Sequence, residues 1–142
     1  MVNVVITGSN RGIGLSLAKV FATRGDRVFA VCRKASDDLV KLAKEKPNIT
    51  IIPDVDVGEP LKTPLRDLIG PDVPVDVMIN NAGILIRQDP ASFEKEEAFE
   101  ENIAKQININ ALGPMRATRS ILPSLHQGSK AAIMDIERRR RH

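Results

Sequence analysis

The stretch TGSNRGIG, residues 7–14, decides the fold of this 142-residue chain. It follows a β-branched run, VNVVI at 2–6, and precedes residues whose apolar positions recur with helical spacing as far as Arg24. Glycines at 8, 12 and 14 permit a sharp turn, a close approach of backbone to a ligand, and tight packing of helix on strand. A helix that starts here directs its free N–H groups at an anion. The pattern therefore predicts a turn that binds a dinucleotide's diphosphate; a plain strand-to-helix turn is the alternative.

The rest of the chain repeats the alternation of strand, turn and helix. Ser36, with two aspartates behind it, is a good helix start, and Gly25 is placed to end the preceding helix. We expect strands at 2–6, 27–31, 48–52, 75–79 and 131–136, and helices at 13–24, from 36 onward, at 61–69, and at 93–125 with an interruption at 113–114. Such alternation implies right-handed crossovers and a parallel sheet. We predict one α/β domain, a Rossmann-type doubly wound sheet, over residues 1–137, followed by a basic tail at 138–142.

Composition limits the environment and the partners. Apolar residues make up 42% and charged residues 27%, which is typical of a soluble globular domain. The single Cys32 fits a reducing compartment, and the apolar run at 4–6 is too short for a signal or a membrane span, so we expect a cytoplasmic protein. The net charge is +3, and Arg138 to Arg141 supply four positive charges, so the remainder is about neutral. We therefore expect neither nucleic acid nor membrane as a partner.

Two motifs at this separation form a specific pair: TGxxxGIG at 7–14, and NNAG at 80–83 directly after the fourth expected strand. With this pair the chain resembles the short-chain dehydrogenase/reductase family, from residue 1 to about residue 136. The stretch INALGPMRATRSILPSLHQG at 109–128 is similar to the C-factor-like branch of that family. The resemblance implies an oxidoreductase with a nicotinamide cofactor, which moves a hydride between the nicotinamide C4 and a small carbonyl or alcohol substrate.

The residues that follow the second strand distinguish NADP from NAD. Members that prefer NAD carry an acidic residue at the end of this strand, where this chain has Cys32, followed by Arg33 and Lys34. Guanidinium and ammonium groups attract the 2′-phosphate of NADP, which a carboxylate repels. Arg11, in the loop, is a second candidate for the same phosphate. We predict NADP, with NAD the weaker candidate; the alternative is that Arg33 and Lys34 are simply solvated.

The resemblance also assigns the remaining cofactor contacts. Asp54 and Val55 match the contact to the adenine, and Asn80 is expected to be structural, tying neighbouring strands together. Backbone around the loop would contact the diphosphate, and the segment after the fourth strand would line the ribose and nicotinamide. The cofactor-binding residues expected in these two segments are Gly8, Ser9, Asn10, Arg11, Gly12, Ile13, Gly14, Asn81, Ala82 and Gly83. No metal site is predicted.

Asn110 matches the active-site asparagine of the family, through the pattern N-x-x-G. The sequence adds an argument of its own, because Pro114 has no N–H. If the helix runs through it, the carbonyl of Asn110 loses its partner four residues later and is free to hold a water for proton relay. Alternatively, Gly113 and Pro114 separate two helices, and Asn110 is a polar surface residue.

The residues that perform the family's chemistry are missing. That chemistry needs Ser, Tyr and Lys, with the Ser directly after the fifth strand. The chain has no Tyr, and Glu137 and Arg138 stand where the serine turn should begin. We expect a chain that is truncated after the fifth strand, binds cofactor weakly and is inactive alone; the rival hypothesis is a nucleotide-binding pseudoenzyme or signalling module. A frameshift, a truncation or a mispredicted gene end explains the four arginines better than a nuclear signal or an anion patch.

This truncation has a structural consequence. The first two helices should cover strands one to three on one face, and the later helices should cover strands four and five on the other. The first face of strands four and five, and the free edge of strand five, should then be exposed. Both features favour a homo-oligomer or aggregation.

Overall fold

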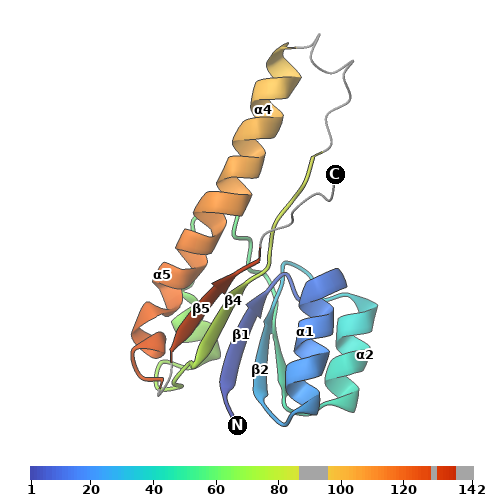
Figure 1. The fold of residues 1–142 in the computed structure, drawn as a ribbon, viewed down its shortest axis with the longest axis vertical. Coiled ribbons are helices and arrows are strands. Elements are labelled where there is room, and N and C mark those ends of the chain that lie inside the picture. Colours follow the sequence, from blue (N-terminus) through green and yellow to red (C-terminus); the bar gives the residue numbers. More distant parts are fainter. Residues whose placement is uncertain (87–95, 129–130, 137–142) are drawn as a thin grey trace.

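The computed structural model describes residues 1–86, 96–128 and 131–136, and in this part of the chain a parallel five-stranded sheet lies between two layers of helices (Figure 1). The strand order is β3-β2-β1-β4-β5. The strands are β1 (Asn3–Thr7), β2 (Arg27–Val31), β3 (Ile49–Ile52), β4 (Val77–Asn80) and β5 (Ala132–Asp135). The helices are α1 (Gly12–Thr23), α2 (Asp37–Glu45), α3 (Leu65–Ile69), α4 (Glu96–Ile107) and α5 (Gly113–Leu125), with the π-helical turn η2 (Asn108–Leu112) between the last two. The predicted doubly wound α/β fold is confirmed.

Each face of the central strands is apolar, as expected for a parallel sheet that is covered on both sides. On one face, Val5 of β1 lies between Phe29 of β2 and Met78 of β4 in the register of the sheet, and all three are buried under α3 and α5. On the other face, Val4 and Ile6 pack against α1 and α2. Successive residues of a strand point to opposite faces, so one short β-branched strand contributes to both cores.

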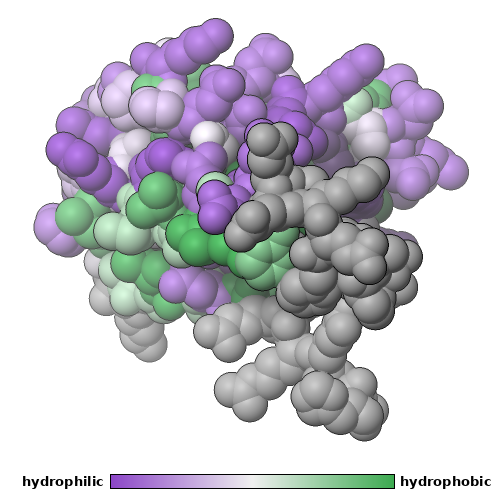
Figure 2. Space-filling view, turned by 90° about the horizontal axis from the view of Figure 1, so that it is seen from above, coloured by the Kyte–Doolittle hydropathy of each residue, from purple (hydrophilic) through white to green (hydrophobic). Residues whose placement is uncertain are grey.

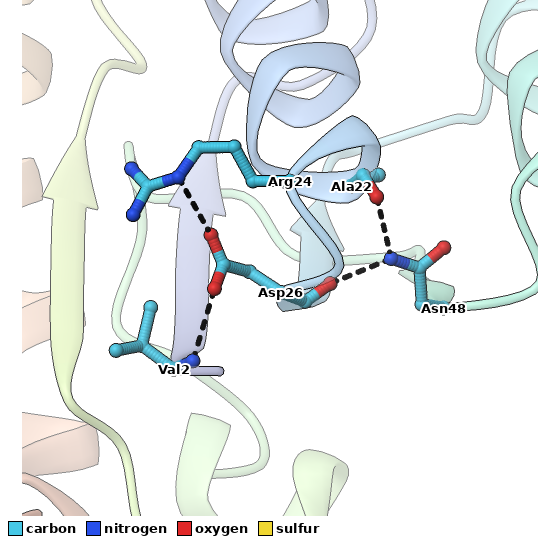
Figure 3. A network of polar contacts seen from close by, with 5 residues as sticks. All are labelled: Val2, Ala22, Arg24, Asp26 and Asn48. Atoms are coloured by element: carbon cyan, nitrogen blue, oxygen red, sulfur yellow. Dashed lines mark hydrogen bonds and ion pairs between the residues drawn. The ribbon is translucent and has the colours of Figure 1, made fainter.

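A network of polar contacts holds the amino end of the sheet together (Figure 3). Asp26 is 3% exposed; its Oδ1 accepts a hydrogen bond from the N–H of Val2 at 3.0 Å, and its Oδ2 lies 3.5 Å from Nε of Arg24. The side chain of Asn48 donates to the carbonyls of Ala22 and Asp26 at 2.8 and 2.7 Å. These contacts join the start of β1, the turn after α1 and the segment before β3.

The long helical stretch does not break at Gly113 and Pro114, so the predicted interruption is wrong. The N–H of Gly113 donates to the carbonyl of Asn108, five residues back, and the chain passes through a π-helical turn into α5. Gly113 is buried against Val57, where an added Cβ would lie 3.1 Å from Cγ2. The result is a long helical run whose α4 end extends beyond the sheet (Figure 1). The expected helix start, at residue 93, lies outside the described residues.

β5 is the least covered strand, and the expected exposed patch is confined to it. Ile133 and Met134 are each 49% exposed, while Ile79 of β4 is buried and Val77 packs against the core beneath α1 and α2. The core beneath α3 and α5 takes residues from β1, β2, β3 and β4, and none from β5. The expectation that β4 would be exposed on its first face is therefore wrong, because neighbouring side chains already bury it.

In the segments that the structure describes, no helix combines the length and the apolar character needed to traverse a bilayer.

Candidate functional site

The glycine-rich loop joins β1 to α1 and packs against the segment that follows β4. Gly8 has φ +65°, and a Cβ added there would lie 2.9 Å from Cα of Ala82. A Cβ on Gly14 would overlap the carbonyl oxygen of Gly8 and lie 2.5 Å from Nδ2 of Asn81. Gly12 has open space around it but φ +55°. Gly8 and Gly14 are therefore needed for close packing, and Gly12 for its backbone conformation.

The amino end of α1 has no side-chain cap, whereas that of α2 is capped. In α2, the hydroxyl of Ser36 accepts from the N–H of Leu39 at 3.1 Å, and two aspartates occupy the first turn. At α1 the N-cap residue is Arg11, whose backbone is extended but whose side chain makes no capping bond, and no acidic residue follows it. The first turn of α1 therefore directs unpaired N–H groups and its positive dipole end towards solvent.

Two loop residues use their side chains to fix the loop itself. Ser9 is fully buried, and its hydroxyl donates to the carbonyl of Ile6 at 2.7 Å. Oδ1 of Asn10 accepts from the N–H of Ser36 at 2.9 Å, and the hydroxyl of Ser36 donates back to the carbonyl of Asn10 at 2.6 Å. Arg11 and Ile13 are exposed on the loop's outer side. Ser9 and Asn10 thus connect the loop to β1 and α2.

The segment 80–83 is joined to the loop by Thr7, for which the sequence alone indicates no role. The hydroxyl of Thr7 accepts from the N–H groups of Asn81 and Ala82 at 3.1 and 3.0 Å. The side chain of Asn81 donates to the carbonyl of Gly8 at 3.1 Å. Thr7 stands in the TG pair of the motif, but the motif alone gives no sign that its hydroxyl bridges β1 and the segment after β4.

Asn80 connects three elements, as its expected structural role requires. Its Nδ2 donates to the hydroxyl of Thr118 in α5 at 3.0 Å and to Oδ1 of Asp135 in β5 at 2.8 Å. Its Oδ1 is buried and accepts no hydrogen bond from the described residues. Thr118 lies in the stretch 109–128 that resembles the family, but the sequence does not show that it contacts Asn80.

The side chain of Asn110 is hydrogen-bonded to the backbone of Ile84. Its Oδ1 accepts from the N–H of Ile84 at 2.8 Å, and its Nδ2 donates to the carbonyl of Ile84 at 2.7 Å. A Cβ on Gly83 would lie 3.1 Å from the same Oδ1, so glycine allows this approach. A free Asn110 carbonyl was expected for an α-helical register, whereas the N–H of Gly113 donates five residues back, to Asn108; in that π register the missing N–H of Pro114 would correspond to the carbonyl of Ile109.

A contact network that the sequence did not reveal holds this π turn in place. Nη1 of Arg116 donates to the carbonyl of Val57 at 2.9 Å, and Nη2 donates to Oδ1 of Asn108 at 2.8 Å. The side chain of Asn108 also donates to the carbonyl of Gly58 at 2.7 Å. The loop after β3 is therefore fixed to the helical turn that carries Asn110.

The residues predicted for the adenosine end lie where β2 and β3 end. Arg33 and Lys34 are exposed, whereas Cys32 is buried; burial, and then the negative charge of Asp54, raise the pKa of its thiol. The N–H of Asp54 donates to the carbonyl of Arg33 at 2.9 Å, and Asp54 has φ +63°. Val55 is buried and donates to the carbonyl of Cys32 at 3.1 Å. The exposed side chains here are thus those of Arg33, Lys34 and Asp54.

A cleft of about 960 Å³ opens between α5, β5 and the segment after β4. Asn81, Ala82, Gly83 and Asn110 line it together with apolar side chains such as Met115. Viewed from above, hydrophobic surface gathers in one region of a mostly hydrophilic face (Figure 2). The loop residues 8–14, Arg33 and Asp54 are not part of this lining, so the expected site residues form two groups. Among the described residues, no group of three His, Cys, Asp or Glu side chains is placed to hold a metal ion.

Comparison with known proteins places this geometry in a family. The family model for short chain dehydrogenases matches residues 2–137. The very-long-chain 3-oxoacyl-CoA reductase of Rattus norvegicus is 33% identical over 141 residues, which cover 93% of this chain and 43% of the reductase. Salutaridine reductase from Papaver somniferum has a TM-score of 0.77 at 24% identity, over 95% of this chain and 56% of that one. An alcohol dehydrogenase from Thermococcus sibiricus, complexed with 5-hydroxy-NADP, has a TM-score of 0.76 at 28% identity, over 94% and 57%. The chain spans about half the length of these relatives.

Proposed function

Because the chain belongs to the short-chain dehydrogenase/reductase family, we propose that it is the dinucleotide-binding part of an oxidoreductase and that it binds NADP(H). The observation that carries the proposal is the uncapped amino end of α1 beside a loop in which Gly8 and Gly14 leave no room for side chains. Those N–H groups and that dipole suit the diphosphate of a dinucleotide. The loop from Gly8 to Gly14 would hold the diphosphate through its backbone, with Ser9 and Asn10 fixing its shape.

The other expected contacts extend from this loop in two directions. Towards α5, the backbone of Asn81, Ala82 and Gly83 would line the ribose and nicotinamide, beside the cleft they already line. Towards β3, Asp54 and Val55 would contact the adenine. The hydrogen bonds that the N–H groups of Asn81 and Ala82 donate to the hydroxyl of Thr7 support this arrangement, because they set the distance between the two halves of the site.

The charges at the end of β2 favour NADP over NAD. Cys32 is buried and neutral at the position where an acidic residue would bind the ribose hydroxyls, and the next two side chains are exposed cations. Arg33, Lys34 and Arg11 would attract a 2′-phosphate. The alcohol dehydrogenase of Thermococcus sibiricus, which was solved with 5-hydroxy-NADP, adds support by analogy.

Bound NADP(H) would supply the hydride chemistry at the nicotinamide C4, on a small carbonyl or alcohol substrate. The chain's own part would be to hold the cofactor and to shape the wall of the cleft, where the two bonds between Asn110 and Ile84 fix the backbone. Asn110 is the residue we assign to the catalytic machinery. The chain has no Tyr to exchange the substrate proton, so we propose that it does not turn over alone.

The absence of Tyr also favours a second candidate, a nucleotide-binding module that regulates a partner. The similarity to the C-factor-like branch, and a cytoplasmic location, stay predictions. Reading the DNA downstream of the His142 codon in all frames separates the candidates. A Y-x-x-x-K pattern there would favour an enzyme's N-terminal part, and its absence would favour the regulatory module.

Fluorescence titration with NADPH and NADH tests the cofactor. We expect Arg33→Asp to weaken NADPH binding about tenfold or more and to change NADH binding little, because only NADPH carries the 2′-phosphate. Lys62→Asp, an exposed position in the loop before α3, is the control with the same change in net charge. Equal loss for both nucleotides would overturn the choice of NADP, and a wild-type chain that binds neither would overturn the proposed function.

A further inference from the structure

The loop that follows β3 is held at both of its ends. At its start, the N–H groups of residues 54–55 donate to two carbonyls just after β2, at 2.9 and 3.1 Å. At its far end, the carbonyl of Val57 accepts from Nη1 of Arg116 at 2.9 Å, and that of Gly58 accepts from the side chain of Asn108 at 2.7 Å. The far end is therefore fixed by two side chains that lie more than 45 positions away in the sequence.

Arg116 fixes this far end through hydrogen bonds to neutral groups. Besides the bond from Nη1 to Val57, its Nη2 donates to Oδ1 of Asn108 at 2.8 Å, and Asn108 itself holds Gly58. A guanidinium presents its donors in one rigid plane, so these two bonds together set its orientation. Among the described residues, no carboxylate lies within ion-pair distance of Arg116. The geometry therefore uses Arg116 as a two-pronged donor and not as the partner of a charge.

Packing shows that the helical run is the fixed part and the loop is the part that it positions. An added Cβ on Gly113 would lie 3.1 Å from Cγ2 of Val57, and one on Gly58 would lie 3.3 Å from Cγ1 of Ile109, so glycine on each side allows the close approach. α5 is anchored in the core by side chains such as Ala117, which is fully buried. The loop has no regular backbone pairing of its own, so its position depends on the helix beside it.

Asp54, at the start of this loop, has a backbone conformation that needs support. Its φ of +63° is left-handed, which residues with a Cβ rarely adopt, and such a conformation persists where the surrounding structure holds it. Val57 follows only three residues later. If the far end of the loop were released, the backbone at Asp54 could relax and its exposed carboxylate would move.

We propose that Arg116 is a positioning residue for the adenine-binding loop. Together with Asn108 it holds residues 57–58 on the π turn, and thereby keeps Asp54 and Val55 where the adenine of NADP(H) would lie. This inference rests on the proposed cofactor binding. None of these residues belongs to β5 or to the lining of the cleft, so the inference does not depend on what covers either of them.

Affinity measurements with two nucleotides test the inference on the 142-residue chain. NADPH is titrated by its fluorescence, and adenosine 2′,5′-bisphosphate, which carries the adenine but no nicotinamide, is titrated by displacing it. We expect Arg116→Met to weaken both about tenfold, because both would use the same adenine-binding loop. Arg66→Met is the matched control: Arg66 is also half-buried, and its Nε donates to the carbonyl of Pro71 at 3.4 Å, in α3 and outside the proposed contacts. It should leave both affinities within about twofold of the wild type.

Asn108→Leu separates positioning from simple attraction by a positive charge. It removes the side-chain bonds of Asn108 to Gly58 and Arg116 but leaves the net charge unchanged. We expect a loss of about tenfold for both nucleotides, and a double variant no more than about twofold weaker than either single one, because both residues act through one network. Arg116→Lys keeps the charge but not the planar fork, and should bind about threefold more weakly than the wild type; it carries the test if Arg116→Met does not fold.

Urea unfolding and far-UV circular dichroism on the same samples show whether each variant is folded at the titration temperature. A merely structural role would lower the free energy of unfolding and leave the dissociation constants of the folded protein unchanged, and that result would overturn the inference. Additive losses in the double variant, or a weaker NADPH with an unchanged bisphosphate, would overturn it too. A wild-type chain that binds neither nucleotide would overturn the proposed function, whereas a wild type that binds both, with variants that bind equally well, would overturn this inference alone.

Discussion

The two ends of the sheet are formed by the same strands but differ in the polar contacts around them. At the amino end, Asp26 and Asn48 are bound to backbone groups of their own chain (Figure 3). At the carboxyl end, Oδ1 of Asn80 and Oδ1 of Asn81 are buried and accept no hydrogen bond from the described residues, and the first turn of α1 is uncapped. Buried polar groups that the protein satisfies stabilise the fold, whereas unsatisfied ones cost free energy unless a partner arrives. Oδ2 of Asp26 and Oγ of Ser124 are likewise buried without a hydrogen bond from the described residues, so the uncapped first turn of α1 is the feature that favours ligand binding at the carboxyl end.

Gly14→Ala should have the largest effect on this contrast. Its added Cβ would overlap the carbonyl oxygen of Gly8, which is backbone and can move only with the loop. We expect the free energy of unfolding to fall by about 2–3 kcal/mol in urea titrations, and NADPH affinity to fall about 100-fold or more. Gly12→Ala is the control, because it meets no atom and only strains a left-handed backbone, at about 1–2 kcal/mol. If Gly12→Ala lost more stability than Gly14→Ala, the packing explanation of the loop would be wrong.

Asp26→Ala tests the amino end of the sheet. Removing the carboxylate leaves the N–H of Val2 without its partner and Arg24 without its ion pair. We expect a loss of about 2 kcal/mol in the free energy of unfolding, with NADPH affinity unchanged within about twofold. Asp72→Ala, on an exposed turn before β4, is the control and should be nearly neutral. A clear loss of cofactor affinity in Asp26→Ala would show that the two ends are not independent.

Arg11→Asp should lower the affinity for NADPH and raise the free energy of unfolding. The backbone of Arg11 already has the extended conformation typical of an N-cap, so an aspartate there would cap α1 and complement its dipole. We expect a gain of about 0.5–1 kcal/mol in unfolding free energy and a loss of about tenfold or more in NADPH affinity. Ser36→Ala, which removes the cap of α2, should lose about 1 kcal/mol. Unchanged NADPH affinity in Arg11→Asp would argue against the amino end of α1 as the diphosphate site.

Much of the fold follows from local sequence, because periodicity and turn residues act within a few positions. The glycine loop, the cap at Ser36 and the end of α1 at Gly25 were all predicted from their immediate neighbours, and the structure contains each of them. The π turn was not predicted, because the buried contact of Gly113 with Val57 joins positions far apart in the sequence. The same is true of Asn110, whose pairing with Ile84 has no local signal.

In the candidate site, too, features with a local sequence signal were predicted and features that depend on distant contacts were not. Spacing identified the loop glycines and the segment 80–83, since both lie at strand ends. It could not identify Thr7, which joins those two segments, or Arg116, which holds the π turn, because the sequence does not show which partner a hydroxyl or a guanidinium will contact. The exposure of β5 was predicted from its place at the sheet edge, but its extent was overestimated, because the burial of Ile79 depends on packing across the sheet.

The smallest expected effect is on the pH dependence of stability. It comes from Cys32, which is buried at the carboxyl end of the sheet. Burial, and then the charge of Asp54, raise the pKa of the thiol, so the folded chain keeps the proton at a pH where the unfolded chain has lost it. Stability from this group is complete below the unfolded pKa and falls as pH rises through the folded one. We expect the wild type to lose more stability than Cys32→Ala as the pH rises above about 8.5, measured by urea unfolding at each pH. Asp54→Asn, which keeps a residue type that tolerates the +63° φ, should reduce this loss; an identical pH profile in all three proteins would contradict the explanation.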